Sequence, residues 1–452
     1  MPPRDTSSAS EPPADARSGP AADTGSRPED DTRPPRVVIV GAGFGGLRAA
    51  RSLADAPVAV TLLDRNNYHT FYPLLYQIGA AEIDATEICH PVRKILRGQA
   101  NARFRMGEVE EIDLDERRVV AGRRSYGYEQ LIVATGSDPH YFGVEGAAEH
   151  AFPLREIEHG EALRNHVLRR FEEAEAADGR PAPGLLDFTV VGGGPTGVEY
   201  AGALAELVAG PVRKDYPVVR EHPVRIRLLE AEDRLLSSLP EKLSRYARER
   251  LEAMGVEVRF GAMVERVGPS SVHLAGGEEI PTETVVWTAG VRGSTAAERW
   301  GLPVDRAGRV GVEPTLQLPD RPEVQVVGDL AGFRRDGETL PMIAPVALQQ
   351  GEHAGRNVGR LVAGEPAEPF VYEDPGMLAT IGRNHAVARL PRITLTGFPA
   401  WVVWVVVHIA KLIGFRNRLV VLLNWAWDYF TYERFSRLIL PTGGEEEDEG
   451  EG

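Results

Sequence analysis

The sequence predicts an α/β fold in which one strand–turn–helix unit occurs twice. Each copy begins with a short apolar strand, residues 37–40 in the first and residues 188–191 in the second, of the kind that is buried in a parallel sheet. Each strand leads into a turn with the spacing G-x-G-x-x-G, and a segment of helix-forming residues follows. The glycines of the two turns are Gly41, Gly43, Gly46, Gly192, Gly194 and Gly197.

This spacing predicts a site for the phosphates of a dinucleotide. The first glycine allows a tight turn, the second lets the backbone approach a pyrophosphate, and the third lets the helix pack closely against the strand. The phosphates would lie on the free N–H groups at the N-terminus of the following helix. The alternative is a Gly-rich turn without a ligand. The context favours the nucleotide site, because the next strand of each copy ends in an acid.

The two acids are Asp64, eighteen positions after the last glycine of its turn, and Glu230, 33 positions after the last glycine of the second turn. A carboxylate in this place accepts hydrogen bonds from an adenosine ribose. The longer second spacing fits an extended helix and loop around residues 208–223. Glu230 would repel a 2′-phosphate, so the sequence favours NAD over NADP, although Arg225 and Arg227 lie nearby on the same strand. Two such folds imply two dinucleotides brought face to face.

The composition limits the partners and the redox chemistry. The chain has 452 residues and a formal net charge of −15, which argues against nucleic acid as the main partner. Its single cysteine excludes an internal disulfide, a C-x-x-C pair and a cysteine-ligated cluster, and we expect no metal. Residues 1–35 have the composition of a disordered tail, and residues 441–452 that of an acidic, solvated one.

Further strands are expected to end near the same crevice. Residues 128–136 (YEQLIVATG) and 284–290 (TVVWTAG) both end in a Gly turn, and a strand over 324–327 is closed by a Gly-Asp pair. The residues at these ends are Thr135, Gly136, Gly290, Gly328 and Asp329. At the carboxyl end of a parallel strand Asp329 points at the ligand crevice, although a helix N-cap is the alternative. We also expect a β-hairpin-like addition over 104–120, a helix over 240–251 and a strand over 256–260.

The segment 65–79 (RNNYHTFYPLLYQIG) is both aromatic and polar, and Pro73 is expected to exclude a regular strand or helix. Such a segment lines a ring-shaped cofactor or is an ordinary buried loop. We interpret His69 as structural rather than catalytic. Cys89, which precedes a histidine, is a nucleophile or, more in keeping with its type, a small buried thiol.

The character of the chain changes near residue 397. Residues 398–413 are apolar apart from His408 and Lys411, a basic cluster occupies 416–418, and a second apolar stretch covers 419–430. Tryptophans with Lys and Arg on amphipathic segments are typical of helices that lie in the membrane interface, so we expect a monotopic anchor. A homodimer interface and a true span remain as alternatives. Four of the six tryptophans lie here: Trp401, Trp404, Trp425 and Trp427.

Taken in order, these motifs resemble those of the flavoprotein oxidoreductases with two dinucleotide-binding domains, and within them the type II NADH dehydrogenases. The segments that carry the resemblance are VIVGAGFGG, LLDRNNYHTFYPLLYQ, VVGGGPTGVEYAGALAEL, VVWTAGV, VVGDLA, ALQQG, LATIGR and GFRNRLVVLLNWAWDYFTYER. The resemblance covers about residues 36–440. It implies two Rossmann-like domains, one for FAD and one for NADH, and a C-terminal region of amphipathic helices that anchors the protein to a membrane.

The resemblance also implies a domain order and a set of site residues. FAD would lie on residues 36–150 and 296–390, NADH on 151–295, and the membrane-associating helices would occupy 391–440. The residues implied for FAD are Gly41, Gly43, Gly46, Asp64, Thr135, Gly136, Gly328 and Asp329. Those implied for NADH are Gly192, Gly194, Gly197, Glu230 and Gly290.

The acceptor side departs from the pattern of this family. Gln349 and Gln350 match a Gln-containing motif at the flavin edge, but Pro345 stands where the family often has the first Gln of that motif, and Pro375 where a Lys is common. Glu199 matches an acid near the nicotinamide and quinone pockets, where it would have a proton-linked or gating role, or would simply cap a hydrogen-bond network.

The implied activity is hydride transfer from NADH to non-covalent FAD, followed by transfer of two electrons to a membrane quinone, without ion pumping. The implied setting is a homodimer on the cytoplasmic face of the inner or plasma membrane, attached through residues 397–435. A single cysteine excludes the disulfide reductases and the sulfide:quinone oxidoreductases. The alternatives left are an oxidoreductase with another acceptor, such as a ferredoxin-like protein, and a membrane-tethered flavin and NAD sensor with little turnover.

Overall fold

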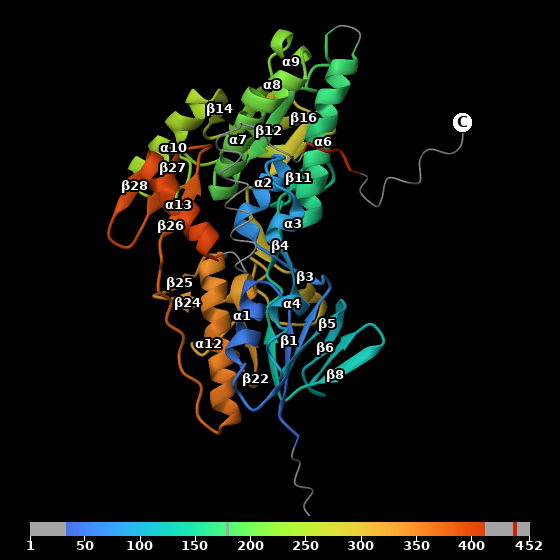
Figure 1. Ribbon diagram of the computed structural model, residues 1–452, viewed down its shortest axis with the longest axis vertical. Helices are drawn as coiled ribbons and strands as arrows, with labels where there is room; N and C mark the ends of the chain where they lie inside the picture. Colours follow the sequence, from blue (N-terminus) through green and yellow to red (C-terminus); the bar gives the residue numbers. More distant parts are fainter. Residues whose placement is uncertain (1–32, 178–179, 412–436, 441–452) are drawn as a thin grey trace, which may run out of the picture. The chain divides into compact units, whose positions relative to one another are not determined.

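The computed structural model describes residues 33–177, 180–411 and 437–440 (Figure 1). The first nucleotide fold is built on a six-stranded sheet whose strands are all parallel to their neighbours except the edge strand β21. In spatial order the strands are β21 (Gln317–Leu318), β22 (Arg321–Val326), β9 (Gln130–Val133), β1 (Arg36–Val40), β2 (Ala59–Asp64) and β5 (Ala102–Met106). Segments on both sides of the second fold in the sequence therefore contribute to one sheet.

The second nucleotide fold repeats this arrangement. Its sheet is parallel throughout, with the order β11 (Ala151–Pro153), β18 (Thr284–Trp287), β12 (Asp187–Val191), β13 (Arg225–Leu229) and β14 (Val256–Arg259). The series β14-β13-β12-β18 corresponds to β5-β2-β1-β9 of the first sheet. The predicted α/β class with two Rossmann-like units is confirmed.

A small antiparallel sheet interrupts each fold at the corresponding point of the chain. In the first fold it consists of β6 (Val109–Asp113), β7 (Arg118–Ala121) and β8 (Arg124–Gly127). In the second it consists of β15 (Val264–Val267), β16 (Ser271–Leu274) and β17 (Glu279–Pro281). The two folds thus share more than their Gly-rich turns.

The principal helices cover the sheets, and two of them, α1 and α7, begin directly at the Gly-rich turns. They are α1 (Phe44–Ser52), α6 (Ile157–Ala176), α7 (Pro195–Leu207), α10 (Glu241–Ala253) and α12 (Ala344–Val362). Helices α1 and α12 lie side by side in the first fold (Figure 1). Gly351 of α12 lies against the backbone of Gly45, and a Cβ there would overlap that backbone, so the glycine permits the close helix contact.

Shorter elements connect these parts. They are β3 (Tyr68–Thr70), η1 (Tyr72–Leu74), α2 (Leu75–Gly79), α3 (Ala85–Ile88), β4 (Cys89–Pro91), α4 (Val92–Ile95), β10 (Ser137–Pro139), α5 (Ala147–His150), β19 (Val291–Gly293), α11 (Ala296–Arg299), β20 (Val310–Gly311), η3 (Gly328–Leu330), β23 (Ala331–Gly332), β24 (Arg334–Arg335) and β25 (Glu338–Thr339). Residues 208–223 hold a π-helical turn, η2 (Val208–Val212), and the helices α8 (Arg213–Asp215) and α9 (Val218–Glu221), which fits the extension expected there.

The last described part of the main body is a three-stranded antiparallel sheet and a helix. Strands β26 (Met377–Thr380), β27 (Ala386–Arg389) and β28 (Thr394–Thr396) pair in sequence order, and α13 (Gly397–Lys411) packs on them through Ala400 and Trp404. Residues 412–436, which include Trp425 and Trp427, lie outside the described residues. Within the described ranges, no helix is both long and apolar enough to cross a membrane.

Two local predictions were wrong. Pro73 does not exclude a helix, because it lies in the first turn of η1, where a proline needs no N–H donor, and α2 follows at once. Phe104 does not belong to a hairpin but to β5, which extends the parallel sheet; the antiparallel strands begin only at Val109. Burial of Phe104 beneath the guanidinium of Arg93 fixes the face of this edge strand.

Candidate functional site

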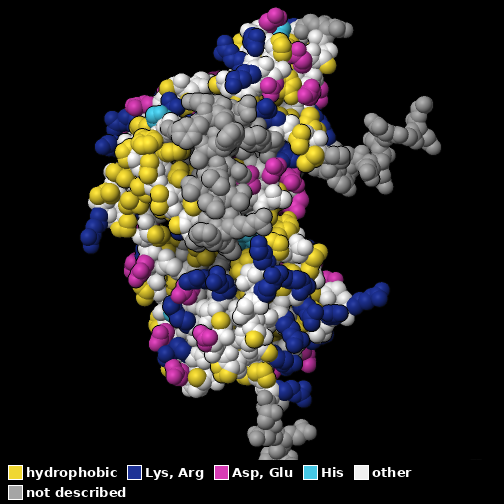
Figure 2. All heavy atoms as spheres, in the orientation of Figure 1, with side chains coloured by type: hydrophobic (Ala, Val, Ile, Leu, Met, Phe, Trp, Pro, Cys, Tyr) yellow, Lys and Arg dark blue, Asp and Glu magenta, His cyan; other side chains and the backbone are white. Residues whose placement is uncertain are grey.

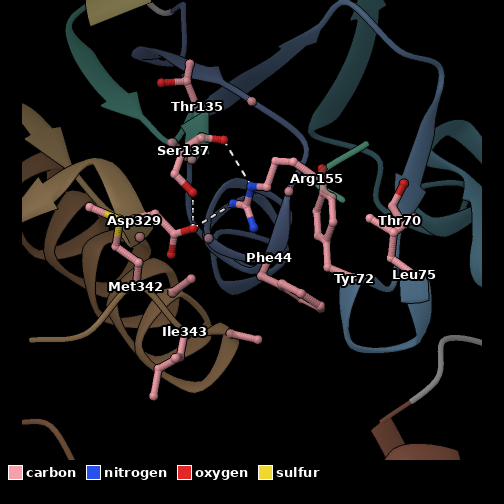
Figure 3. A pocket seen from close by; sticks show the side chains of 18 of the residues that line it. Phe44, Thr70, Tyr72, Leu75, Thr135, Ser137, Arg155, Asp329, Met342 and Ile343 are labelled. Carbon is pink, nitrogen blue, oxygen red and sulfur yellow. Dashed lines mark hydrogen bonds and ion pairs between the residues drawn. The ribbon is translucent and has the colours of Figure 1, made fainter. Parts of the chain in front are cut away.

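A cavity of about 640 Å³ lies where the two nucleotide folds meet. Its walls come from the first Gly-rich turn and η3 of the first fold, the N-terminus of α7 in the second fold, the aromatic segment around α2, and the end of α13. The predicted site residues that line it are Gly41, Gly43, Asp64, Thr135, Gly136, Gly328, Asp329, Glu199 and Pro345. Figure 3 shows the part around Asp329 and Arg155.

The two predicted acids hold their own Gly-rich turns in the same way. Asp64 Oδ2 accepts the N–H of Ala42 at 2.6 Å, and Glu230 Oε2 accepts the N–H of Gly193, also at 2.6 Å. The remaining oxygen of each carboxylate accepts an N–H two residues further along the chain, at 2.8 Å in both cases. Burial raises the pKa of Asp64, and the two N–H donors oppose that rise. Each acid therefore lies against the turn that would carry the phosphates.

The glycines of both turns have the geometry that a tight turn and close helix packing require. The first glycine of each turn, Gly41 or Gly192, has a φ of +102° or +107°, which strongly favours glycine. A Cβ on Gly46 or Gly197 would overlap the carbonyl oxygen of that first glycine, so the helix can approach only without a side chain. A Cβ on the middle glycine of each turn would meet no atom within 4 Å, so both turns leave open space at the helix N-terminus.

Asp329 lies in the part of the cavity wall that the first fold contributes. It is in η3, directly after β22, and its side chain is buried rather than placed as a helix N-cap, so the ligand-facing interpretation is the one that the geometry supports. Oδ2 accepts hydrogen bonds from Ser137 Oγ and from Arg155 Nη2, each at 2.7 Å. Gln350 Oε1 accepts the N–H of Gly328 at 2.8 Å, which fixes the turn before Asp329. Nearby, Thr135 Oγ1 is buried without a hydrogen-bond partner in the described part of the chain.

Sequence reasoning missed Arg155 and Ser137. Arg155 also donates from Nε to the carbonyl oxygen of Ser137 at 3.0 Å, and its guanidinium lies over the ring of Tyr72, 5.0 Å from the ring centre (Figure 3). Ser137 directly follows the predicted Thr-Gly turn, so its position in the sequence was a usable signal. No local pattern marked Arg155, because its partner Asp329 is 174 residues away in the chain.

Glu199 is buried on α7, at the wall that the second fold contributes. Its Oε1 accepts the N–H of Thr380 from β26 at 3.2 Å. Burial raises the pKa of Glu199 to about 8, and the Thr380 N–H and the Trp404 side chain oppose the rise. The carboxyl is therefore mainly protonated at neutral pH and lies within a wall that also includes Tyr76.

The C-terminal helix completes the cavity. His408 and Lys411 line it, together with Val407. The His408 ring stacks on Trp404, with centroids 4.3 Å apart, and its Nδ1 lies 2.7 Å from the Trp404 carbonyl oxygen. Burial lowers the pKa of His408 to about 4, so the ring is neutral at physiological pH. Helix α13 therefore contributes directly to the site, in addition to any contact it makes elsewhere.

Several predicted site residues do not line the cavity. Gln349 exchanges two hydrogen bonds with the backbone of Glu373, and neither it nor Gln350 is among the residues that line the cavity. Gly290 lies under the ring of Phe142, where a Cβ would overlap that ring. Besides these two glutamines, six other predicted residues do not line the cavity: Gly46, Gly192, Gly194, Gly197, Glu230 and Gly290.

His69 and Cys89 both have the surroundings of structural residues. His69 is buried, its Nδ1 lies 2.9 Å from the carbonyl oxygen of Ala42, and burial lowers its pKa to about 4. Cys89 lies beside Thr70 in the β3–β4 pair, and burial raises the pKa of its thiol to about 11, which disfavours the nucleophilic thiolate.

The residues present fit an FAD-type dinucleotide in the first fold. The open N-terminus of α1, the Asp64 carboxylate and the buried Thr135 hydroxyl without a partner supply the donors and acceptors that such a molecule needs. The second fold repeats the turn and the acid. The first turn lines the cavity, and the second turn leads into α7, whose N-terminus lines the same cavity. This pair of turns defines an oxidoreductase of the two-dinucleotide class.

Comparisons with known proteins agree with this class. Residues 35–351 match the family model described as pyridine nucleotide-disulphide oxidoreductase, and residues 375–432 match the NDH2 C-terminal domain. The chain is 38% identical to the type II NADH:quinone oxidoreductase Ndh of Mycobacterium tuberculosis, over 90% of this chain and 91% of that protein. It is 30% identical to the type II NADH:quinone oxidoreductase of Staphylococcus aureus, over 78% of this chain and 89% of that protein.

A solved structure extends the likeness to the fold. NDH2 from Plasmodium falciparum, in a structure described as a complex with NADH, aligns with a TM-score of 0.79 at 17% identity and covers 90% of this chain and 100% of its own. The chain belongs to the type II NADH:quinone oxidoreductase family.

Proposed function

We propose that this protein oxidises NADH and reduces a quinone, with FAD as its resident cofactor. The observation that carries the proposal is the shared cavity, which is lined both by the first Gly-rich turn and by the start of α7 in the second fold. A ligand of each fold can therefore reach the same space. The family to which the chain belongs supports this choice of substrates.

The residues proposed to hold FAD are those of the first turn, Asp64 and Asp329. When bound there, FAD would accept a hydride from NADH and pass two electrons to the acceptor. The chain's own contribution is to bind and orient: the N–H groups at the start of α1 would face the phosphates, and the half-buried Asp64 and the buried Asp329 would accept ribose and ribityl hydroxyls.

We propose that Glu199 holds a proton for quinone reduction. A quinone takes up two protons when it is reduced, and Glu199 lines the cavity in its protonated form at neutral pH because burial raises its pKa to about 8. The Thr380 N–H holds Oε1, so the carboxyl keeps a fixed place in the cavity wall. No residue of the lining is required as a nucleophile.

Glu230 supports NADH rather than NADPH as the donor. Its carboxylate is held by two backbone N–H groups at the end of β13, so it cannot easily turn away from the ribose position. A 2′-phosphate placed there would meet a fixed negative charge. The two nearby arginines are already paired, since Arg225 and Arg227 both contact Asp187.

We further propose that the protein attaches to the cytoplasmic face of a membrane through α13 and the chain that follows it. Phe398, Val402 and Val406 are 53%, 39% and 60% exposed and recur every four residues, which forms one apolar stripe. Figure 2 shows hydrophobic side chains gathered over β27, β28 and α13 at the left of the view. We also propose that the protein is a homodimer, as the family resemblance implies. Sedimentation of the FAD-loaded protein tests this proposal.

The test of the function is turnover with defined substrates. Purified, FAD-loaded protein is assayed for NADH-dependent reduction of a short-chain quinone, with NADPH and a ferredoxin-type protein as alternative substrates in parallel. Efficient turnover with NADH and quinone is expected. Turnover with a protein acceptor alone would move the assignment to a reductase of that kind, and NADH binding without turnover would favour a sensor.

A further inference from the structure

Arg155 joins the two nucleotide folds at the part of the cavity wall that contains Asp329. It follows β11 and precedes α6, which both belong to the second fold, yet its guanidinium makes its hydrogen bonds and its cation–π contact with residues of the first fold. Nη2 donates to Asp329 Oδ2 at 2.7 Å, Nε donates to the Ser137 carbonyl oxygen at 3.0 Å, and the guanidinium lies over Tyr72 (Figure 3). Three different elements therefore fix one guanidinium.

These contacts use one oxygen of Asp329 and leave the other for a ligand. Oδ2 accepts both Ser137 Oγ and Arg155 Nη2, whereas Oδ1 makes no hydrogen bond to the residues that the structure describes. The side chains of Arg155 and Asp329 are 23% and 10% exposed, and both residues line the cavity. An acceptor is thus presented to the cavity by a carboxylate that cannot rotate without breaking two hydrogen bonds.

Such an arrangement prepares the carboxylate before the ligand arrives. A charge-assisted hydrogen bond is roughly twice as strong as a neutral one, and the planar guanidinium gives it a fixed direction. A carboxylate held in this way loses little conformational freedom when a hydroxyl group donates to its free oxygen. Without Arg155, the same carboxylate would lose the cation that donates a hydrogen bond to it, and Arg309 would be the positive charge left nearby.

We propose that Arg155 is a positioning residue of the FAD site: it orients Asp329 for the hydroxyls of the ribityl chain and so makes FAD affinity depend on the second fold. The inference rests on the proposed function only in taking FAD as the ligand of the first fold. It adds a residue outside that fold, from the short connection between β11 and α6 that lines the cavity.

The test is a binding cycle on protein from which FAD has been removed. FAD affinity is measured by the quenching of flavin fluorescence for the wild type, Arg155→Met, Asp329→Asn and the double variant. Each single change is expected to weaken binding about 10- to 100-fold, the range for loss of a charged hydrogen bond. The double variant is expected to bind no more weakly than Asp329→Asn, because Arg155 acts through that carboxylate. Arg155→Lys keeps the positive charge but loses the planar guanidinium. Its FAD affinity is expected to lie between those of the wild type and Arg155→Met.

The matched control is Arg170→Met. Arg170 is a similarly buried arginine on α6 that pairs with Glu173 and Glu283 outside the cavity, so its loss should leave FAD affinity unchanged. A second readout is the rise in Tm that FAD produces, which should shrink for Arg155→Met and not for Arg170→Met.

Three results overturn the inference: wild-type FAD affinity in Arg155→Met, effects of Arg155→Met and Asp329→Asn that multiply in the double variant, or an equal loss in the Arg170→Met control. If Arg155→Met does not fold, Arg155→Lys carries the same comparison. Failure of the wild-type chain to bind FAD would contradict the proposed function instead, so the two failures are distinguishable.

Discussion

Asp64 and Glu230 occupy equivalent places at the ends of β2 and β13, and each carboxylate accepts an N–H from the Gly-rich turn of its own fold at 2.6 Å. The same hydrogen bond thus recurs in two folds that share little sequence beyond their glycines. It ties the acid at the ribose end of each site to the loop at the phosphate end. A change at either acid is therefore expected to affect nucleotide binding at both ends.

Replacement of Glu230 tests the choice of nicotinamide cofactor. Glu230→Gln keeps the size of the side chain and removes its charge. We expect KM for NADH to rise about tenfold, as for loss of a charged hydrogen bond, and the preference of kcat/KM for NADH over NADPH to fall. Steady-state kinetics with both cofactors measure this. Glu241→Gln, at an exposed position of α10, is the control. An unchanged NADH:NADPH ratio in Glu230→Gln would refute the assignment.

Two glycines of the second turn separate folding from binding. A Cβ at Gly197 would overlap the Gly192 carbonyl oxygen, whereas Gly194 has open space around the Cβ position. We expect Gly197→Ala to lower Tm strongly, and Gly194→Ala to cost about 1 kcal/mol or less because only a helix N-cap changes. Gly194→Ala should nevertheless weaken NADH binding, since its methyl group would occupy the space at the helix N-terminus. Thermal unfolding and NADH titration on the same samples measure the two effects. Normal NADH affinity in Gly194→Ala would show that the nucleotide binds elsewhere.

The buried carboxyl of Glu199 predicts a pH-dependent stability. Its pKa rises from an ordinary value of 4.5 in the unfolded chain to about 8 in the fold. Between these values the folded protein binds the extra proton, so the free energy of unfolding falls as pH rises. Glu199→Gln has no carboxyl to ionise, so it does not lose stability in this way. The free energy of unfolding of Glu199→Gln, relative to that of the wild type, should therefore increase from pH 5 to pH 8 by an amount on the order of a few kcal/mol.

Denaturant unfolding at several pH values measures this difference. Glu206→Gln on the same helix is measured in parallel, so that the general effect of replacing a glutamate of α7 by glutamine is known. A constant difference between wild type and Glu199→Gln across this pH range would show that the Glu199 carboxyl is ionised in the fold.

The acceptor side can be tested at Pro345 and Gln349. Pro345 lines the cavity in the first turn of α12, whereas the side chain of Gln349 holds the backbone of Glu373. We expect Pro345→Gln to change KM for quinone severalfold and to leave flavin reduction by NADH unchanged. Gln349→Ala should act mainly through stability, by the loss of two hydrogen bonds of about 1 kcal/mol each. The opposite pattern, a quinone effect confined to Gln349→Ala, would move the acceptor site away from the N-terminus of α12.

Much of this architecture could be predicted because its signals are local. The strand, the glycine spacing and the following acid lie within a few dozen residues of one another, so Asp64, Glu230 and both turns could be assigned from the chain alone. The exception among local signals is Pro73, where the ring fits the first turn of η1. The parallel pairing of β5 with β2 could not be predicted, since strand pairing depends on partners far away in sequence.

The finer structure of the site depends on such distant contacts. Arg155 acquires a role only when Asp329, 174 residues later, comes beside it. Gln349 and Gln350 were assigned to the acceptor side from a motif, but their side chains hold backbone groups of Glu373 and Gly328. The high pKa of Glu199 likewise arises from burial by α13 and β26, which its own helix does not reveal.

The connection of both nucleotide folds to a quinone through one cavity is tested most directly by anaerobic stopped-flow of the FAD-loaded protein, first with NADH and then with a short-chain quinone. We expect rapid loss of flavin absorbance in the first step and rapid recovery in the second, with Glu199→Gln slowing the second step more than the first. No loss of absorbance on mixing with NADH, or loss without recovery by quinone, would contradict that connection.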